Sequence, residues 1–152
     1  MNKIRFGDSK RPGFSFIILE EPFDDVRKEM VVQEARCFND NNLNVRNCLG
    51  IISKLIYLIN QGEKFLPSEI ETLFFDSTKL LQTNDIELRR MVYFILRVLN
   101  EKQNYSFVVT SMLMNDINKN NDMYRANSFR MLGQIINSND NINLLERYLK
   151  NV

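Results

Sequence analysis

Histidine is absent from this 152-residue sequence, and glycine and proline are scarce, with five and three residues. Without histidine, the chain lacks the usual general base of enzymes and a common ligand for metals. So few glycines and prolines disfavour sandwiches and barrels, which need many tight turns. Glycine-rich nucleotide motifs and the serine-hydrolase elbow are absent as well. These absences predict a protein that is not an enzyme and that holds no cofactor or metal.

The chain also lacks disulfide patterns, strong net charge and long apolar runs. Its two cysteines, Cys37 and Cys48, fit neither a zinc site nor a disulfide framework, so we expect packed thiols in a reducing compartment. Twenty basic and nineteen acidic residues give a net charge of +1, which predicts no nucleic-acid binding. The sequence shows neither a membrane-spanning run nor a secretory signal, which favours a cytoplasmic protein.

Apolar residues recur at the three- and four-residue spacing of amphipathic helices from about residue 28 onward, and strand-like alternation is absent. The spacing predicts a short helix near residues 31–38 and then helices over about residues 45–61, 67–81, 84–99, 106–118, 123–137 and 142–150. Residues 1–27 mix basic residues with glycine and proline, which predicts an irregular arm. We therefore expect an all-α chain with a helical region over residues 28–152.

Start and stop signals accompany several predicted helices. Gly62 can adopt the left-handed conformation that ends a helix. Ser68, with Glu71 three residues later, predicts a capping box for the third helix, and Asn84-Asp85-Ile86-Glu87 predicts the start of the fourth by a similar device. The residues that follow the helical spacing are expected to form the core: Val31, Val32, Ala35, Phe38, Val45, Leu49, Ile51, Ile52, Leu55, Ile56, Leu58, Ile59, Ile70, Leu73, Phe74, Leu80, Leu81, Leu88, Met91, Val92, Ile95, Leu99, Phe107, Thr110, Leu113 or Met114, Ile117, Phe129, Leu132, Ile136, Leu145, Tyr148 and Leu149.

Short connections between the predicted helices indicate antiparallel neighbours, in either a closed bundle or an open stack. Arg46, Arg89 and Arg125 each lie near a helix start after an Asn- or Asp-rich turn, and they are 43 and 36 residues apart. These distances bracket the roughly 40-residue repeat of HEAT and armadillo arrays. We therefore expect an α-solenoid of stacked antiparallel hairpins.

Arg89 and Arg90 are adjacent near the start of the fourth predicted helix. Their planar guanidinium groups could bind an acidic partner or a phosphate. The alternative is that one of them pairs within the stack, with Asp85 or with the turn of the next repeat. From the residues alone, a generic HEAT-type scaffold stays open, while a small helical enzyme is disfavoured by the missing histidine and the absent nucleotide motifs.

Several segments resemble one known family, in order along the chain. They are VVQEARCFN at residues 31–39, KLIYLINQGE at 54–63, LRRM at 88–91, DMYRAN at 122–127 and ERYLK at 146–150. Together they resemble the adaptin-like N-terminal trunk of the gamma subunits of coatomer, the COPI vesicle coat, over about residues 22–152. The large chains of clathrin adaptors are more distantly similar and supply an alternative.

The resemblance implies a scaffold segment of a coat that acts in Golgi-to-ER and intra-Golgi transport, bound peripherally to the cytosolic face of Golgi membranes and vesicles. It implies two kinds of partner, the other coatomer subunits and an Arf-family GTPase in its GTP form. By position in this family, Phe107, Thr110 and Ser111 are candidate contacts for the GTPase, and core burial is the alternative for Phe107. Since the family's gamma subunits are longer, we expect a fragment whose open end self-associates.

Overall fold

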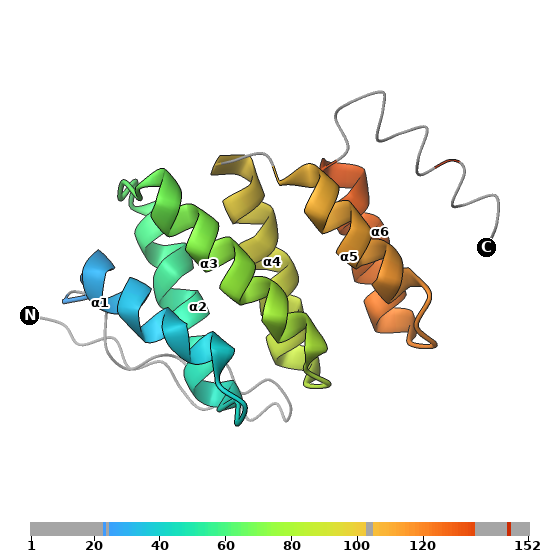
Figure 1. Ribbon diagram of the computed structural model, residues 1–152, viewed down its shortest axis with the longest axis horizontal. Coiled ribbons are helices and arrows are strands. Elements are labelled where there is room, and N and C mark those ends of the chain that lie inside the picture. Colours follow the sequence, from blue (N-terminus) through green and yellow to red (C-terminus); the bar gives the residue numbers. More distant parts are fainter. Residues whose placement is uncertain (1–22, 24, 103–104, 136–145, 147–152) are drawn as a thin grey trace, which may run out of the picture.

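The protein is described here as a computed structural model, which places residues 23, 25–102, 105–135 and 146 (Figure 1). Every regular element that it bounds in these residues is a helix or a 3₁₀ turn, which confirms the all-α class. The predicted helix over residues 142–150 and most of the predicted arm lie outside the described residues. The elements are α1 (Lys28–Glu34), η1 (Ala35–Asn39), α2 (Val45–Asn60), α3 (Pro67–Lys79), η2 (Leu80–Gln82), α4 (Ile86–Lys102), α5 (Ser106–Ile117) and α6 (Asp122–Ile135).

The helices form a stack of pairs in two layers (Figure 1). α1 contacts α2, α3 contacts α4 and α5 contacts α6, while α4 also contacts both α2 and α6. One layer therefore holds α2, α4 and α6, and the other holds η1, α3 and α5. Because each pair packs on the next along the chain, the arrangement is an open solenoid and not a closed bundle. None of the described helices has both the length and the apolar character needed to cross a bilayer.

An Asn or Asp side chain caps each helix of the α2–α4–α6 layer. In each case the side-chain oxygen accepts a hydrogen bond from the backbone N–H three residues later, at 3.1 Å for Asn44, 2.8 Å for Asp85 and 3.2 Å for Asn121. The caps are 41 and 36 residues apart and mark the repeat. Arg89 and Arg125 occupy the same position after their caps, whereas Arg46 lies two positions earlier, so the predicted arginine series holds for two of three members.

Two helix ends show how far local signals decide the boundaries. Gly62 has a φ of 83° and ends α2 as predicted. The third helix begins differently from the prediction, because Pro67 occupies its first turn and makes Leu66 the capping residue. The Glu69 carboxylate accepts the N–H of Leu66 at 2.7 Å, so Glu69, and not Ser68 with Glu71, satisfies this end.

The core runs without a break through the stack, and α4 lies at its centre. Leu88, Val92, Ile95 and Leu99 are buried as predicted, because α4 is covered by α2, α3 and α6. The prediction for Phe129 was wrong: its side chain is 37% exposed, and Met131 is buried instead. Among the described residues, α6 buries Tyr124, Ser128, Met131 and Leu132, and Phe129 lies at the edge of this face. The predicted core residue Ile136 lies outside the described residues.

Candidate partner-binding surface and buried polar network

The three candidate contacts for a GTPase lie on α5 but differ in exposure. Phe107 is 74% exposed, which removes core burial as an explanation for this residue. Ser111 is also exposed, whereas Thr110 is 3% exposed and faces the core. Phe107 and Ser111 are one turn apart, so they share one side of the helix. The structure therefore brings two of the three predicted residues together on an accessible surface.

The opposite side of α5 is fixed by its apolar residues. Val109, Leu113 and Ile117 recur at four-residue spacing and are at most 2% exposed. Burial of such side chains contributes about 1.5–3 kcal/mol each and sets the rotation of the helix. The orientation of Phe107 toward solvent follows from this packing.

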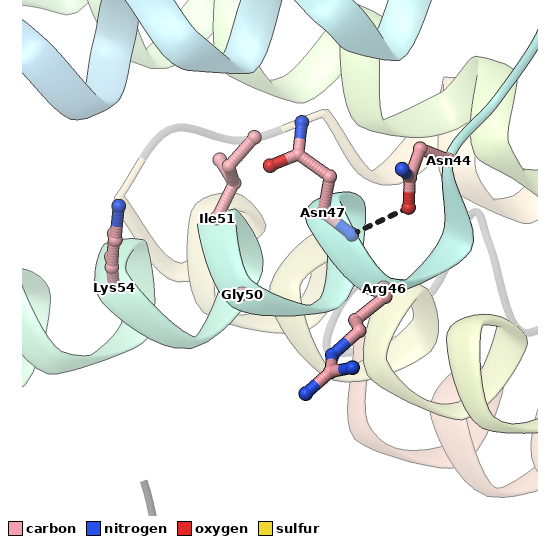
Figure 2. A pocket seen from close by; sticks show the side chains of 6 residues that line it. All are labelled: Asn44, Arg46, Asn47, Gly50, Ile51 and Lys54. Atoms are coloured by element: carbon pink, nitrogen blue, oxygen red, sulfur yellow. Dashed lines mark hydrogen bonds between the residues drawn. The ribbon is translucent and has the colours of Figure 1, made fainter. Parts of the chain in front are cut away.

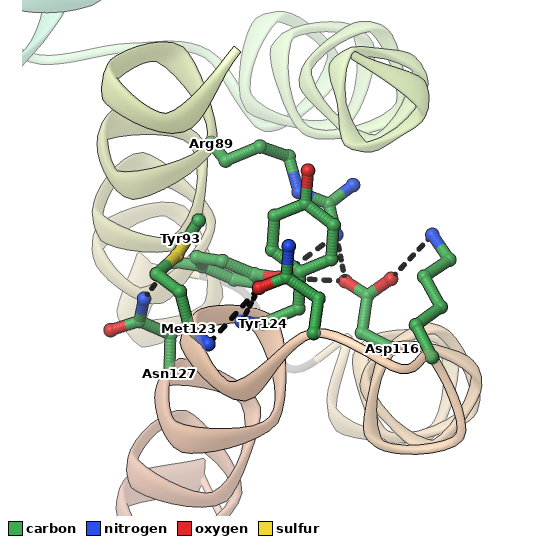
Figure 3. A network of polar contacts seen from close by, with 8 residues as sticks. Arg89, Tyr93, Asp116, Met123, Tyr124 and Asn127 are labelled. Carbon is green, nitrogen blue, oxygen red and sulfur yellow. Dashed lines mark hydrogen bonds and ion pairs between the residues drawn. The ribbon is translucent and has the colours of Figure 1, made fainter. Parts of the chain in front are cut away.

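Arg89 is completely buried at the junction of α4, α5 and α6 (Figure 3). Its Nη2 donates to Asp116 Oδ2 at 2.5 Å and to the Tyr93 hydroxyl at 2.9 Å. The Tyr93 hydroxyl donates to the same carboxylate oxygen at 2.8 Å. The guanidinium carbon also lies 4.2 Å from the ring centroid of Tyr124, a cation–π contact from α6. The pairing of Arg89 is therefore inside the stack.

Burial disfavours the charged forms of Arg89 and Asp116, but the hydrogen bonds and the ion pair that they make outweigh this effect. The pKa of Asp116 is lowered, because hydrogen bonds from Arg89, Lys119 and Tyr93 stabilise the carboxylate. The pKa of Arg89 is raised by its bonds to Asp116 and Tyr93. Burial, together with the bond to Asp116, raises the pKa of Tyr93 to about 12. Arg89 and Asp116 are therefore both charged at neutral pH, and the network is a structural tie.

Asp116 itself was missed by the sequence reasoning. A signal was available, because Asp116 is an acidic residue adjacent to Ile117 on a helix side that is otherwise apolar. Lys119 pairs with its second oxygen at 2.8 Å from the turn before α6. Arg89 therefore pairs within the stack, as one of the two interpretations held, but its partner is a residue of α5 and neither Asp85 nor the turn of the next repeat. The neighbouring Arg90 is exposed.

The two cysteines are free thiols, as expected. Cys48 is buried and Cys37 is half-buried, and the Asn47 amide donates to the Cys37 sulfur at 3.6 Å. Burial raises the pKa of Cys37, and it raises the pKa of Cys48 to about 11. Both are therefore protonated and weakly nucleophilic at neutral pH.

A shallow groove lies along the start of α2 (Figure 2). Its polar groups already have structural roles, since Asn44 caps the helix and Lys54 pairs with Glu34 at 2.9 Å. Among the described residues, no group of three His, Cys, Asp or Glu side chains could hold a metal ion. The geometry in this part of the chain offers surfaces for protein contacts.

Comparison with known proteins agrees with this interpretation. Residues 27–152 match the family described as the adaptin N-terminal region. Similar proteins include coatomer subunit gamma of Arabidopsis thaliana, 47% identical over 129 residues, and coatomer subunit gamma-2 of Takifugu rubripes, 40% identical over 129 residues. Coatomer subunit gamma of Drosophila melanogaster is 40% identical over 128 residues. These matches cover 84–85% of this chain but 14–15% of the relatives, so the chain spans a small part of their length.

Proposed function

The chain belongs to the family of adaptin N-terminal regions, and we propose that it is a helical-repeat segment of a coatomer gamma subunit in the COPI coat. The observation that carries the proposal is the 40–47% identity to coatomer gamma subunits of plants and animals, over most of this chain. Paired helices with exposed outer residues suit a scaffold that binds partners along its length.

In this role the segment would act by protein contacts and not by catalysis. Its partners would be the other coatomer subunits, and it would work at the cytosolic face of Golgi membranes and vesicles, in Golgi-to-ER and intra-Golgi transport. Membrane attachment would be peripheral and would come from the assembled coat. The self-association expected from the sequence stays a prediction, which analytical ultracentrifugation would check.

The finer proposal is that α5 contacts an Arf-family GTPase in its GTP form. The exposed Phe107 supports it, because an aromatic side chain that is 74% exposed gains free energy when a partner covers it. Ser111, one turn away, can add a hydrogen bond at the same surface. Thr110 is buried, so we assign it to the packing that orients these two residues.

A binding experiment with the whole chain tests both the coat assignment and the proposed contact with a GTPase. The immobilised chain is incubated with cytosol and a non-hydrolysable GTP analogue or GDP, and the retained proteins are identified by mass spectrometry. We expect coatomer subunits under both conditions and an Arf-family GTPase with the analogue only. Retention of no coat subunit would contradict the coat assignment.

The variant Phe107→Glu separates the GTPase surface from the coat assignment. We expect it to lower GTPase retention about tenfold or more while coat subunits are retained. Met30→Glu is the matched control, because Met30 is also exposed, at 57%, but lies on α1. Equal GTPase retention by Phe107→Glu and the unmodified chain would overturn the proposed role of α5 and would leave the coat assignment standing.

A further inference from the structure

A groove between α4 and α6, here called the α4–α6 groove, is a second surface with a distinct chemistry. Three arginines from the two helices line it, together with aromatic, amide and thioether side chains. It lies apart from the α5 surface proposed to contact a GTPase. Its main lining residues are Arg90, Phe94 and Arg97 from α4, and Arg130, Met131 and Gln134 from α6.

The charge of the α4–α6 groove has one sign. Arg90, Arg97 and Arg130 contribute three positive charges, and no carboxylate lines the groove. The ion pairs found in the described part of the chain involve none of these three arginines. The acidic residues of the two helices lie outside the lining and are Glu87, Glu101 and Asp122.

Arg97 is held in place but keeps hydrogen-bonding capacity. Its Nη1 donates to Gln134 Oε1 at 3.1 Å, which joins α4 to α6. Its guanidinium carbon lies 4.9 Å from the ring centroid of Phe94, and the ring fixes one side of the guanidinium plane. Its buried Nε has no acceptor among the described residues. A guanidinium held this way loses little conformational entropy when it binds an anion.

We propose that the α4–α6 groove binds an acidic segment of a partner protein through carboxylates that pair with Arg90, Arg97 and Arg130. Carboxylates match the planar fork of guanidinium and form charge-assisted hydrogen bonds that are stronger than neutral ones. Phe94, which is 39% exposed, adds an apolar contact. Arginine and aromatic side chains together are enriched in protein interfaces.

The length of the groove defines the spacing of the acidic residues. Arg90 and Arg97 are seven residues apart on α4, which is about 10 Å along the helix axis. A peptide in the polyproline II conformation rises about 9 Å in three residues, and side chains three residues apart lie on the same face. Acidic residues at every third position of such a segment would therefore reach Arg90 and Arg97.

Other anionic ligands fit the observations less well. Nucleic acids are attracted mainly by long-range positive potential, and this chain has a net charge of only +1. A membrane surface would contact side chains that project from the protein, whereas the guanidinium of Arg97 lies between two helices with its Nε buried. A short acidic peptide can enter such a groove.

The test uses fluorescence anisotropy with the whole chain. The probe is a fluorescein-labelled peptide with glutamate at every third position, and its control is the same peptide with glutamine. The variant combines Arg90→Gln with Arg130→Gln, because both side chains are exposed and their loss leaves the core intact. We expect the variant to bind the glutamate peptide about tenfold more weakly or worse, and we expect the glutamine peptide not to bind the unmodified chain.

Charge-matched controls decide between a defined groove and general attraction. Arg27→Gln with Arg36→Gln removes the same charge from exposed positions away from the groove and should change affinity less than about twofold. Equal weakening by both double variants would overturn the proposal, as would equal binding of both peptides. Vesicles containing phosphatidylserine and a single-stranded RNA are tested in parallel. Tighter binding of either one through Arg90 and Arg130 would also overturn it. This test is independent of any coat partner, so its failure would leave the proposed function standing.

Discussion

Arg89 keeps its charge at zero exposure because its Nη2 donates to both Asp116 and Tyr93. A buried ion pair contributes little net stability, since the cost of removing two charges from water offsets much of their attraction. Its value lies in specificity, because a wrongly docked α5 would leave both charges buried without partners. The pair therefore fixes how α5 and α6 sit against α4.

The first prediction removes one charge of this pair. Asp116→Asn should lower the free energy of unfolding by about 3–5 kcal/mol, because Arg89 is then buried without a counter-charge. The double variant Arg89→Met with Asp116→Leu should lose less than the single variants Arg89→Met and Asp116→Leu together. Urea denaturation followed by circular dichroism measures all four variants.

A surface pair provides the control for this prediction. Glu34 pairs with Lys54 at 2.9 Å, and the two side chains are 37% and 34% exposed. Glu34→Gln should therefore cost less than about 1 kcal/mol. Losses of similar size at Glu34 and Asp116 would show that the burial of Arg89 does not have the proposed effect.

The environment of Arg89 was only partly predictable. The sequence placed an arginine near a helix start and favoured a partner inside the stack. It could mark Asp116 as an acidic residue on an apolar helix side but could not pair it with Arg89, because 27 residues separate the two and local periodicity carries no information on such a pair. The exposure of Phe107 was also undecided, since it depends on which side of α5 meets the other helices.

At the scale of single elements, the ends of α2 are set by residues with defined conformations. After its last turn, the Gly62 N–H bonds to the Ile59 carbonyl at 3.1 Å and the Glu63 N–H bonds to the Leu58 carbonyl at 3.0 Å. This is the Schellman motif, which requires a left-handed residue at the position of Gly62. Gly50, in contrast, lies inside α2, and a Cβ there would meet nothing within 4 Å.

The second prediction compares these two glycines. Gly62→Ala should destabilise the protein by about 1–2 kcal/mol, because a side chain disfavours the left-handed conformation. Gly50→Ala should stabilise it by about 0.5–1 kcal/mol, because alanine restricts the unfolded chain and favours the helix. Thermal unfolding of the two variants shows whether each substitution lowers or raises the melting temperature. A shift of both melting temperatures in the same direction would contradict this account of α2.

Helix starts were predictable where one residue decides them and less so where two compete. α4 starts within the predicted segment 84–87, and Asp85 is the residue that caps it. For α3, the expected cap at Ser68 competes with Pro67, whose fixed φ and missing N–H suit the first helical position. Proline prevails, and the cap moves to Leu66 with Glu69 as its acceptor. The face of α6 was misjudged at Phe129, because the apolar spacing allowed two rotations of this helix.

For the whole molecule, the stack makes stability a property of neighbouring pairs. α2 contacts α4 and α4 contacts α6, so α4 links the two ends of the described array. In such arrays the effect of a core change is transmitted mainly to the adjacent repeat. The sequence predicted the stack through repeated turns, but the order of contacts required the structure, since a closed bundle would have used the same helices.

The third prediction in this series uses three leucines that occupy the same position of the repeat. Leu55, Leu96 and Leu132 are each the eleventh residue after the cap of their helix, and all are at most 1% exposed. Substitution of any one by alanine should cost about 2–5 kcal/mol. The three variants therefore remove the same side-chain atoms at one end, at the centre and at the other end of the described array.

Hydrogen exchange measured by mass spectrometry distinguishes where each change acts. Leu132→Ala should raise exchange in α5 and α6, while exchange in α2 stays close to that of the unmodified protein. Leu55→Ala should raise exchange in α2, while exchange in α5 and α6 stays close to that of the unmodified protein. Leu96→Ala should raise exchange in both directions, because α4 contacts α2, α3 and α6. If all three variants raise exchange equally in every helix, the chain unfolds as one cooperative unit and the nearest-neighbour description is wrong.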